Sequence, residues 1–282
     1  MREISLQLPH LRLAGQAWGE ARLPPLLAIH GWLDNAASFD QLAPLLSSRF
    51  HIVAIDLPGH GRSEPRAAGS WYPFIDWPDD VYGAMRALGW ERCTLLGHSL
   101  GGAIASVYAA AHPQQVERLL LIESLGPLTQ SAESALQQLR RGYAQRAAYA
   151  AKSLRVFDTL EVAVDARRVA NDLDEPAARA LVERGLRQVD GGWSWSTDPR
   201  LTVATPIRHT EAQLQALLAG VEAPTLAILA DPPTSYLPTA MMDGRAACIP
   251  DVRVLRMTGN HHLHTAHAQP LAEAILQFCG NG

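Results

Sequence analysis

A serine flanked by glycines is the clearest sign of chemistry in this sequence. Residues 97–101 read Gly-His-Ser-Leu-Gly, with an apolar run before them and a helical pattern after them. Glycines two positions before and after Ser99 permit a sharp strand-to-helix turn, which exposes the serine hydroxyl above the sheet. The turn also leaves the backbone N–H of Leu100 unpaired at a helix start, where it can hold an oxyanion. We therefore interpret Ser99 as a nucleophile.

A run of histidines near the end of the chain offers the base that a serine nucleophile needs. Residues 259–267 read GNHHLHTAH, and a neutral imidazole is suited to proton transfer at neutral pH. We assign His261, directly after the Gly-Asn turn, as the base, and interpret His262 and His264 as packing or supporting residues. Metal binding is the rival interpretation, but no Cys or HExxH pattern accompanies the run, so we expect no metal.

Two carboxylates compete for the role of the acid that orients His261. Asp231 ends the apolar run TLAILAD, but Pro232 and Pro233 follow it and restrict the backbone there. Glu123 ends the run VERLLLIE, the first strand pattern after the helix that follows the serine. A glutamate at that strand end has the length to reach an imidazole. We favour Glu123 and keep Asp231 as the alternative acid.

The segment His-Gly-Trp at 30–32 ends another apolar run and offers a second oxyanion donor. We assign this role to the backbone N–H of Trp32, because Gly31 allows the chain to approach closely. A mainly apolar lining is typical of small-molecule sites, and it suggests a hydrophobic acyl or aryl ester. The candidate substrate-binding residues are Trp32, Leu125, Leu128, Trp193 and Trp195. The last two either line the pocket or seal an insertion onto the core.

Strand and helix patterns alternate along the elements that must position these residues. Residues 3–9 and 11–19 predict an N-terminal hairpin, and helical patterns are centred on 35–48, 76–90, 103–113 and 269–278. Apolar runs of strand length occupy 24–32, 51–61, 92–102, 116–124, 223–230 and 251–259. Near-continuous apolar strands separated by helices predict a parallel sheet that is covered on both faces.

The alternation stops after Gly126. Residues 127 to about 220 contain Ala-, Gln- and Arg-rich helical patterns and no buried strand run. We predict one α/β domain, formed by residues 1–126 and 221–282, which a helical cap of residues 127–220 interrupts at the carboxyl edge of the sheet.

Composition narrows the classes of protein further. The chain has 282 residues, of which 48% are hydrophobic and 18% are charged, with a net charge of −4. This favours one large domain, and scattered charges predict no nucleic-acid partner. No apolar run is long enough for a membrane span, and no signal peptide is recognised. The 3 cysteines lie far apart without a CxxC spacing, so we expect reduced thiols in the cytoplasm. The Gly-rich segment DLPGHGRS lacks the GKS or GKT of a phosphate loop, and we expect no cofactor.

Four segments together resemble the α/β-hydrolase superfamily: HGWLDNAASF, DLPGHGRS, GHSLGG and GNHHLH, in this order over most of the chain. The sequence is most similar to the serine hydrolase-like proteins, also in GGWSWSTDPRL. The resemblance implies an eight-stranded, mostly parallel sheet with a cap, and it supports the roles given above to Ser99, His261, Trp32 and Leu100. Most members carry the acid three residues after a strand-end glycine, where this chain has Pro233. Some members draw the acid from the strand end that Glu123 occupies.

A serine at this turn favours acyl transfer to water, whereas family members with aspartate there perform other reactions. We therefore expect a serine hydrolase that cleaves a carboxylic ester of a small to medium hydrophobic substrate through an acyl-enzyme intermediate. Thioesterase, C–C hydrolase or perhydrolase chemistry on the same residues is an alternative, as is a non-catalytic ligand-binding protein. The partner that we expect is a small molecule; the oligomeric state stays open.

Overall fold

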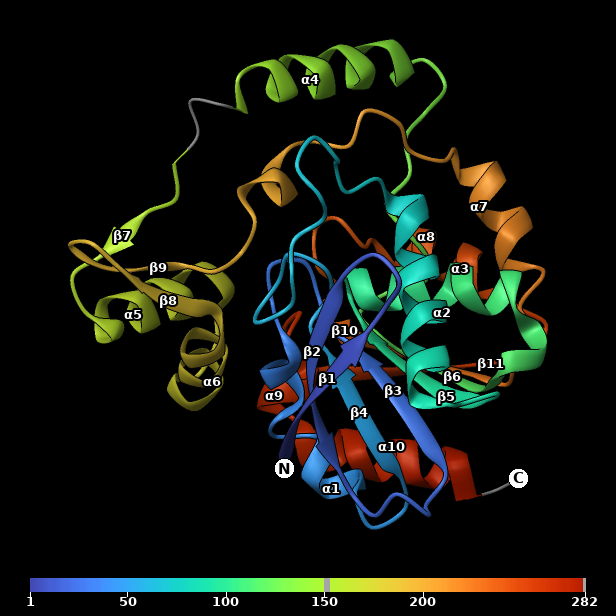
Figure 1. The fold of residues 1–282 in the computed structure, drawn as a ribbon. Coiled ribbons are helices and arrows are strands. Elements are labelled where there is room, and N and C mark those ends of the chain that lie inside the picture. Colours follow the sequence, from blue (N-terminus) through green and yellow to red (C-terminus); the bar gives the residue numbers. More distant parts are fainter. Residues whose placement is uncertain (150–152, 281–282) are drawn as a thin grey trace.

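An eight-stranded sheet forms the centre of the computed structural model, which describes residues 1–149 and 153–280 (Figure 1). The strand order is β1-β2-β4-β3-β5-β6-β10-β11. Only the pairs β1–β2 and β2–β4 are antiparallel. The strands are β1 (Arg2–Gln7), β2 (Arg12–Trp18), β3 (Pro25–Ile29), β4 (His51–Ile55), β5 (Cys93–His98), β6 (Val116–Ile122), β10 (Thr225–Asp231) and β11 (Val252–Thr258). The predicted hairpin and the eight-stranded, mostly parallel sheet are confirmed.

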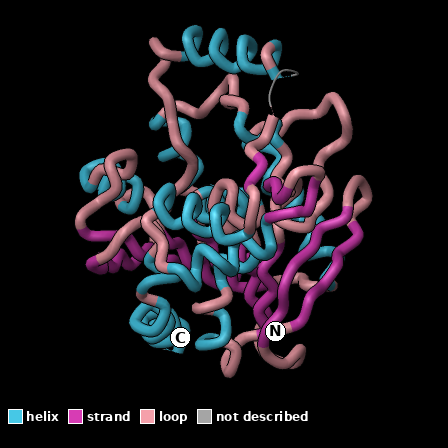
Figure 2. The backbone as a smooth tube through the Cα atoms, turned by 90° about the vertical axis from the view of Figure 1, so that its left-hand side faces the viewer, coloured by secondary structure: helices cyan, strands magenta, loops and turns pink. Residues whose placement is uncertain are grey.

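Helices cover both faces of this sheet, as Figure 2 shows from the side. Along β3, Leu27 and Ile29 join one buried cluster, while Leu26 and Ala28 join the other, because successive side chains point to opposite faces. The helices on the first face are α2 (Trp77–Leu88), α3 (Leu100–Ala111), α7 (Glu211–Leu218) and α8 (Thr239–Ala246). The helices on the second face are the 3₁₀ helix η1 (Ala36–Phe39), α1 (Ala43–Leu46), α9 (Leu263–Ala266) and α10 (Ala268–Gly280). Two short 3₁₀ turns complete the core, η2 (Phe74–Asp76) and η3 (Pro113–Gln115).

Local sequence explains several boundaries. The Asn35 side chain accepts a hydrogen bond from the Ala37 N–H and so caps η1. Gly89 ends α2 in the left-handed conformation, with φ 70°. The sequence analysis missed α8, which lies between β10 and β11. Two parallel neighbouring strands need such a crossover.

The insertion between β6 and β10 contains strands as well as helices. Its elements are α4 (Ala135–Ala147), β7 (Val156–Phe157), α5 (Leu160–Asn171), α6 (Glu175–Gly185), β8 (Leu186–Val189), β9 (Gly192–Trp195) and η5 (Pro199–Thr202). The strands pair as a three-stranded antiparallel sheet in the order β7-β9-β8. The expectation of a helical cap therefore missed a small sheet, because strands this short show no clear periodicity.

The last helix of the predicted cap range belongs with the core. Leu214 and Leu218 of α7 are buried in the cluster that also holds the residues of α3. In contrast, α5 and α6 have a cluster of their own around Phe157, Val164 and Leu181. We propose that residues 127–220 form the cap except for α7, which packs on the core.

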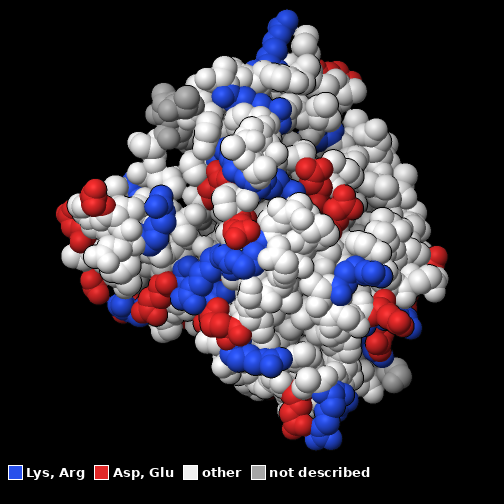
Figure 3. All heavy atoms as spheres, in the orientation of Figure 1, with Lys and Arg blue, Asp and Glu red and all other residues white. Residues whose placement is uncertain are grey.

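The surface carries both signs of charge. On the face seen in Figure 3, acidic and basic side chains are interspersed rather than gathered in a stripe. Among residues 1–149 and 153–280, no helix combines the length and the apolar character that crossing a bilayer requires.

Candidate active site

Ser99 lies at the sharp turn between β5 and α3. Its backbone adopts φ 52° and ψ −115°, a conformation that costs free energy for a residue with a side chain. The turn holds because the Ser99 N–H donates to the carbonyl oxygen of Ile122 at 2.9 Å. Glycine is required on both sides. A Cβ at Gly97 would lie 2.5 Å from the Gly101 backbone, and one at Gly101 would overlap the carbonyl of Ile29.

His261 lies in the loop after β11 and meets a buried carboxylate. Its Nδ1 is 3.1 Å from Oε2 of Glu123, the residue directly after β6. The imidazole is partly exposed, whereas the Glu123 side chain is 2% exposed. The contact fixes Nδ1 as the donor to the carboxylate and leaves Nε2 free to accept a proton.

Glu123 is itself held by the backbone of the neighbouring strand. Its second oxygen, Oε1, accepts a hydrogen bond from the Ala230 N–H at 2.5 Å, and its own N–H donates to the Ile228 carbonyl at 2.9 Å. The residue has φ 53°, which is uncommon outside glycine. This strained and fully paired position aims the carboxylate at His261.

Asp231, the alternative acid, is the last residue of β10 and is exposed. Its carbonyl accepts a hydrogen bond from the Gly259 N–H at 3.2 Å. Among the residues that the structure describes, its carboxylate forms no hydrogen bond with His261. Of the two candidate acids, the structure therefore brings Glu123, the favoured one, to the imidazole.

The serine and the histidine reach the same strand edge from different elements. His98, the neighbour of Ser99, contacts His261: its Nε2 lies 2.9 Å from the His261 carbonyl oxygen, and the two ring centroids are 4.9 Å apart. No hydrogen bond joins Ser99 Oγ to His261 in the described part of the chain. Catalytic hydrogen bonds of enzymes without substrate are often long, and they tighten when the substrate binds.

The two predicted oxyanion donors come from the residue after Ser99 and from the loop after β3. Leu100 is the first residue of α3, so its N–H has no partner within the helix. Trp32 follows Gly31 just beyond β3, and its indole Nε1–H donates to the Leu201 carbonyl at 3.1 Å. The Trp32 side chain is thus held against the cap while its backbone stays in the loop beside the elbow.

The cap holds the loop that contains Trp32 at two further points. Arg167 of α5 forms an ion pair with the buried Asp34. Asn35 donates to the carbonyl of Leu181 in α6 at 2.8 Å. Burial raises the pKa of Asp34, but the Arg167 guanidinium and nearby imidazoles outweigh this and hold it below its ordinary value. Sequence reasoning missed these contacts, because nothing in the sequence pairs residues so far apart.

Two of the proposed substrate-binding residues have exposed side chains and three do not. Trp32 is 53% exposed and Leu128 is 45% exposed. Leu125 is fully buried in the core, and Trp193 and Trp195 pack on the cluster inside the cap. Leu125 is thus covered by protein and offers no surface to a substrate, whereas Trp193 and Trp195 are only partly buried and stay candidate substrate contacts.

Tyr236 is a site residue that sequence reasoning missed. It lies in the loop after β10, with its ring edge-on to that of His261 and the centroids 5.6 Å apart. Its side chain is 48% exposed. A tyrosine in an irregular loop gives no pattern by which it could have been found.

A separate hollow of about 560 Å³ lies between the loop at 59–65 and the strands of the cap. Arg187, Asp190 and Asp198 are among its lining residues, and neither Ser99 nor His261 is. We do not count it as part of the candidate active site.

Comparisons with known proteins identify the family and the fold. The family model described as the alpha/beta hydrolase fold matches residues 24–189. A serine hydrolase-like protein of Danio rerio is 32% identical over 98% of this chain and 87% of its own length. A hypothetical protein of Pseudomonas aeruginosa PAO1 is 38% identical; its crystal structure superposes with a TM-score of 0.92 over 99% of this chain and 100% of that one. The thioesterase domain from the curacin biosynthetic pathway is 25% identical, with a TM-score of 0.86 over 98% of this chain and 99% of its own.

Proposed function

Because the chain belongs to the α/β-hydrolase family, we propose that it is a serine hydrolase that cleaves a carboxylic ester through an acyl-enzyme intermediate. The hydrogen bond between His261 Nδ1 and the buried Glu123 carboxylate carries this proposal. It pairs a base with an orienting acid at the edge of the sheet where Ser99 forms the elbow.

The proposed reaction begins with attack of Ser99 Oγ on the ester carbonyl carbon, while His261 Nε2 takes the hydroxyl proton. The N–H groups of Trp32 and Leu100 stabilise the oxyanion of the tetrahedral intermediate. His261 then gives its proton to the departing alcohol, and the acyl group stays on Ser99. Water attacks this acyl-enzyme with the same base, and the carboxylic acid leaves. Glu123 orients His261 and stabilises the imidazolium that forms twice in each cycle.

The substrate that we propose is a small to medium hydrophobic ester. Support comes from the exposed apolar side chains of Trp32 and Leu128 and from the Tyr236 ring beside His261. A panel of aryl esters of increasing acyl length should show a clear optimum in kcat/KM. Equal activity across the panel would contradict a defined apolar acyl site.

A thioester is the second candidate substrate. The likeness to a thioesterase domain over 98% of this chain favours it, and the proposed catalytic groups act on either bond. A comparison of matched acyl thioesters and oxygen esters, measured as kcat/KM, decides between the two.

The decisive test of catalysis is labelling with a fluorophosphonate probe. The wild type should label at one site, and Ser99→Ala should not label. Ser106→Ala is a matched control, because Ser106 is buried within α3 and bonds to the Gly102 carbonyl. A wild-type protein that is folded but unlabelled would favour the non-catalytic alternative.

We also propose a cytoplasmic location. The three cysteines, Cys93, Cys248 and Cys279, are all free thiols, which is typical of a reducing compartment.

A further inference from the structure

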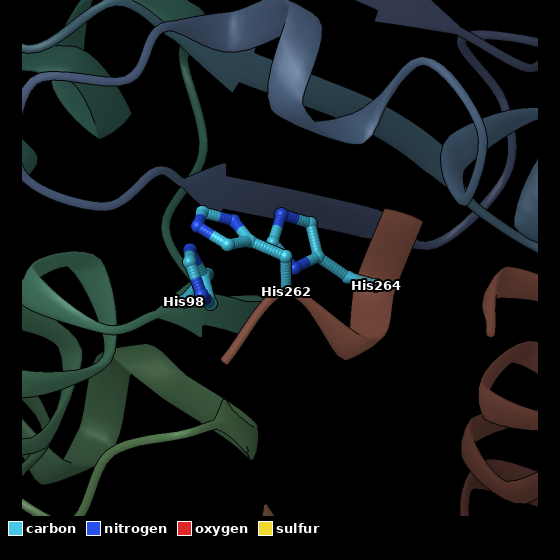
Figure 4. A group of neighbouring side chains, drawn as sticks. All are labelled: His98, His262 and His264. Atoms are coloured by element: carbon cyan, nitrogen blue, oxygen red, sulfur yellow. The ribbon is translucent and has the colours of Figure 1, made fainter. Parts of the chain in front are cut away.

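Three buried histidines meet behind the proposed catalytic residues. His98 ends β5, and His262 and His264 lie at the start of α9. Their exposed fractions are 1%, 4% and 0%. The rings converge in Figure 4, and one nitrogen of each lies within 4.8 Å of the others. The sequence does not reveal that His98 joins His262 and His264, because His98 lies on a strand more than 160 residues earlier in the chain.

One nitrogen of each ring has no hydrogen-bond partner among the residues that the structure describes. His98 Nε2 faces the His261 carbonyl oxygen at 2.9 Å, and His264 Nε2 faces Ser38 Oγ at 2.7 Å. The Nδ1 atoms of all three rings are buried, and none has a partner within residues 1–149 and 153–280. Unpaired buried polar atoms are costly and uncommon in folded proteins, so a group of three requires an explanation.

The protonation state of His98 follows from its partner. A carbonyl oxygen can only accept, so His98 Nε2 carries the proton and Nδ1 presents a lone pair. A Cβ at position 31 would lie 2.9 Å from this Nδ1, so Gly31 keeps the space beside it open. This Nδ1 is therefore free to accept a hydrogen bond or to bind a metal ion.

A carboxylate lies beside the cluster. Asp34 Oδ2 is 3.7 Å from His98 Nδ1, and the other oxygen of Asp34 forms the ion pair with Arg167.

We propose that His98, His262 and His264 together bind one divalent transition-metal ion of the Zn²⁺ type. Imidazole nitrogens suit zinc, copper and nickel, whereas calcium and magnesium prefer oxygen ligands. Tetrahedral zinc with Zn–N bonds near 2.0 Å holds its nitrogens about 3.3 Å apart. Because the nitrogens of the cluster lie within 4.8 Å of one another, the imidazoles must draw together by up to about 1.5 Å when the ion binds. The proposal does not depend on the proposed ester hydrolysis.

The ion has a structural consequence for the neighbouring residues. His98 precedes Ser99, and His262 follows His261. A metal bound to His98 and His262 thus ties the elbow after β5 to the loop after β11. This fixes the spacing of the nucleophile and the base without contacting the substrate.

Metal binding to the full-length protein tests this directly. After removal of metals with a chelator, the protein should take up one Zn²⁺ per chain. At about a hundredfold excess over Kd, its unfolding temperature should rise by about 5 °C. Co²⁺ in place of Zn²⁺ should give the visible absorption bands of a tetrahedral site. His262→Gln and His264→Gln should abolish each effect, whereas His267→Gln, in the same loop but outside the cluster, should keep them.

X-ray absorption of the zinc-loaded wild type tests the ligand set without any variant. Three imidazole nitrogens near 2.0 Å are expected. Fewer than three imidazoles, uptake that equals that of His264→Gln, or no uptake by the wild type would each overturn the proposal. The last result would indicate that the cluster is filled by water only.

Discussion

The Glu123 carboxylate divides its two oxygens between the Ala230 N–H and the His261 imidazole. Replacing it by glutamine keeps the shape but removes the charge that stabilises the imidazolium. We predict that Glu123→Gln lowers kcat on an aryl ester by up to about 10⁴-fold. Asp231→Asn is the matched control; because Asp231 is exposed and bonded elsewhere through its carbonyl, its kcat should stay within a few-fold of the wild type.

The assignment of the acid fails if only the Asp231 variant loses activity. Thermal unfolding of both variants shows whether a loss of kcat reflects a loss of fold. A fluorophosphonate labelling rate that falls in Glu123→Gln while its unfolding temperature is unchanged would locate the defect at the imidazole.

At the scale of single residues, the sequence indicated which residue types form the candidate site, because a glycine-flanked serine and a run of histidines are local patterns. It favoured Glu123 but could not bring it to His261, since 138 residues separate them. Contacts between distant segments, such as Tyr236 with His261 or His98 with His264, have no local signature. The burial of Leu125 could not be predicted either, because the sequence around an apolar residue after a strand does not differ between a pocket residue and a core residue.

At the scale of elements, the crossing of α3 over β3 depends on a missing side chain. A methyl group on Gly101 would overlap the Ile29 carbonyl, which cannot move without disturbing the sheet. We predict that Gly101→Ala destabilises the protein by about 3 kcal/mol in urea unfolding. At Gly244, inside α8, an added Cβ meets no atom within 4 Å. We therefore expect Gly244→Ala to raise the free energy of unfolding by up to about 1 kcal/mol. Equal effects of the two changes would contradict the packing argument.

A second contact between elements joins the cap to the loop of the base. Asn260 Nδ2 donates to the carbonyl and carboxylate oxygens of Asp172, at the end of α5, at 2.7 and 3.0 Å. Its Oδ1 accepts the His262 N–H at 2.9 Å. Asn260→Ala removes all three hydrogen bonds and frees the loop on both sides of His261.

We predict that Asn260→Ala lowers kcat by about tenfold, which corresponds to about 1.4 kcal/mol, because it removes the three hydrogen bonds that hold the loop. Asp172→Gly keeps the hydrogen bond from Asn260 to the backbone carbonyl of residue 172 and should therefore lower kcat less than Asn260→Ala does. Separate measurements of kcat and KM distinguish positioning of the base from substrate binding. A change in KM alone would contradict a role of Asn260 in holding the base.

The elements of the core were predictable because each parallel strand is apolar on both faces. The elements of the cap were less predictable. Its strands are two to four residues long and partly exposed, so neither length nor alternation separates them from loops. α8 was missed because its sequence, TAMMDGRA, has no clear apolar stripe; only the parallel pairing of β10 with β11 requires it.

At the scale of the whole molecule, we expect acid to lower the free energy of unfolding through buried histidines that are not among the proposed metal ligands. Burial lowers the pKa of His30 to about 4 and that of His60 to about 3. In the unfolded chain both titrate near 6.5. The unfolded state therefore binds more protons below pH 6.5, and the stability that these rings contribute is lost as the pH falls from 6.5 towards 4. Each ring adds a slope of about 1.4 kcal/mol per pH unit in this window.

Urea unfolding at a series of pH values from 8 to 4 measures this slope. His60→Phe keeps the ring packing against Trp77 and His30 but removes one titrating group. Its free energy of unfolding should fall less steeply below pH 6.5 than that of the wild type. Identical slopes would mean that His60 does not carry the acid sensitivity.

The position of Glu123 before the cap has a consequence for how such a protein diversifies. Ser99, Trp32, Leu100 and Glu123 all precede residue 127, within one uninterrupted stretch of chain. Only His261 lies beyond the insertion. The cap could therefore change in length or sequence without separating the proposed nucleophile from its proposed acid, provided that its contacts with the Trp32 loop and with Asn260 are kept and the loop after β11 returns to the same sheet edge. Selectivity for substrates could then change in the cap while the reacting groups are inherited intact.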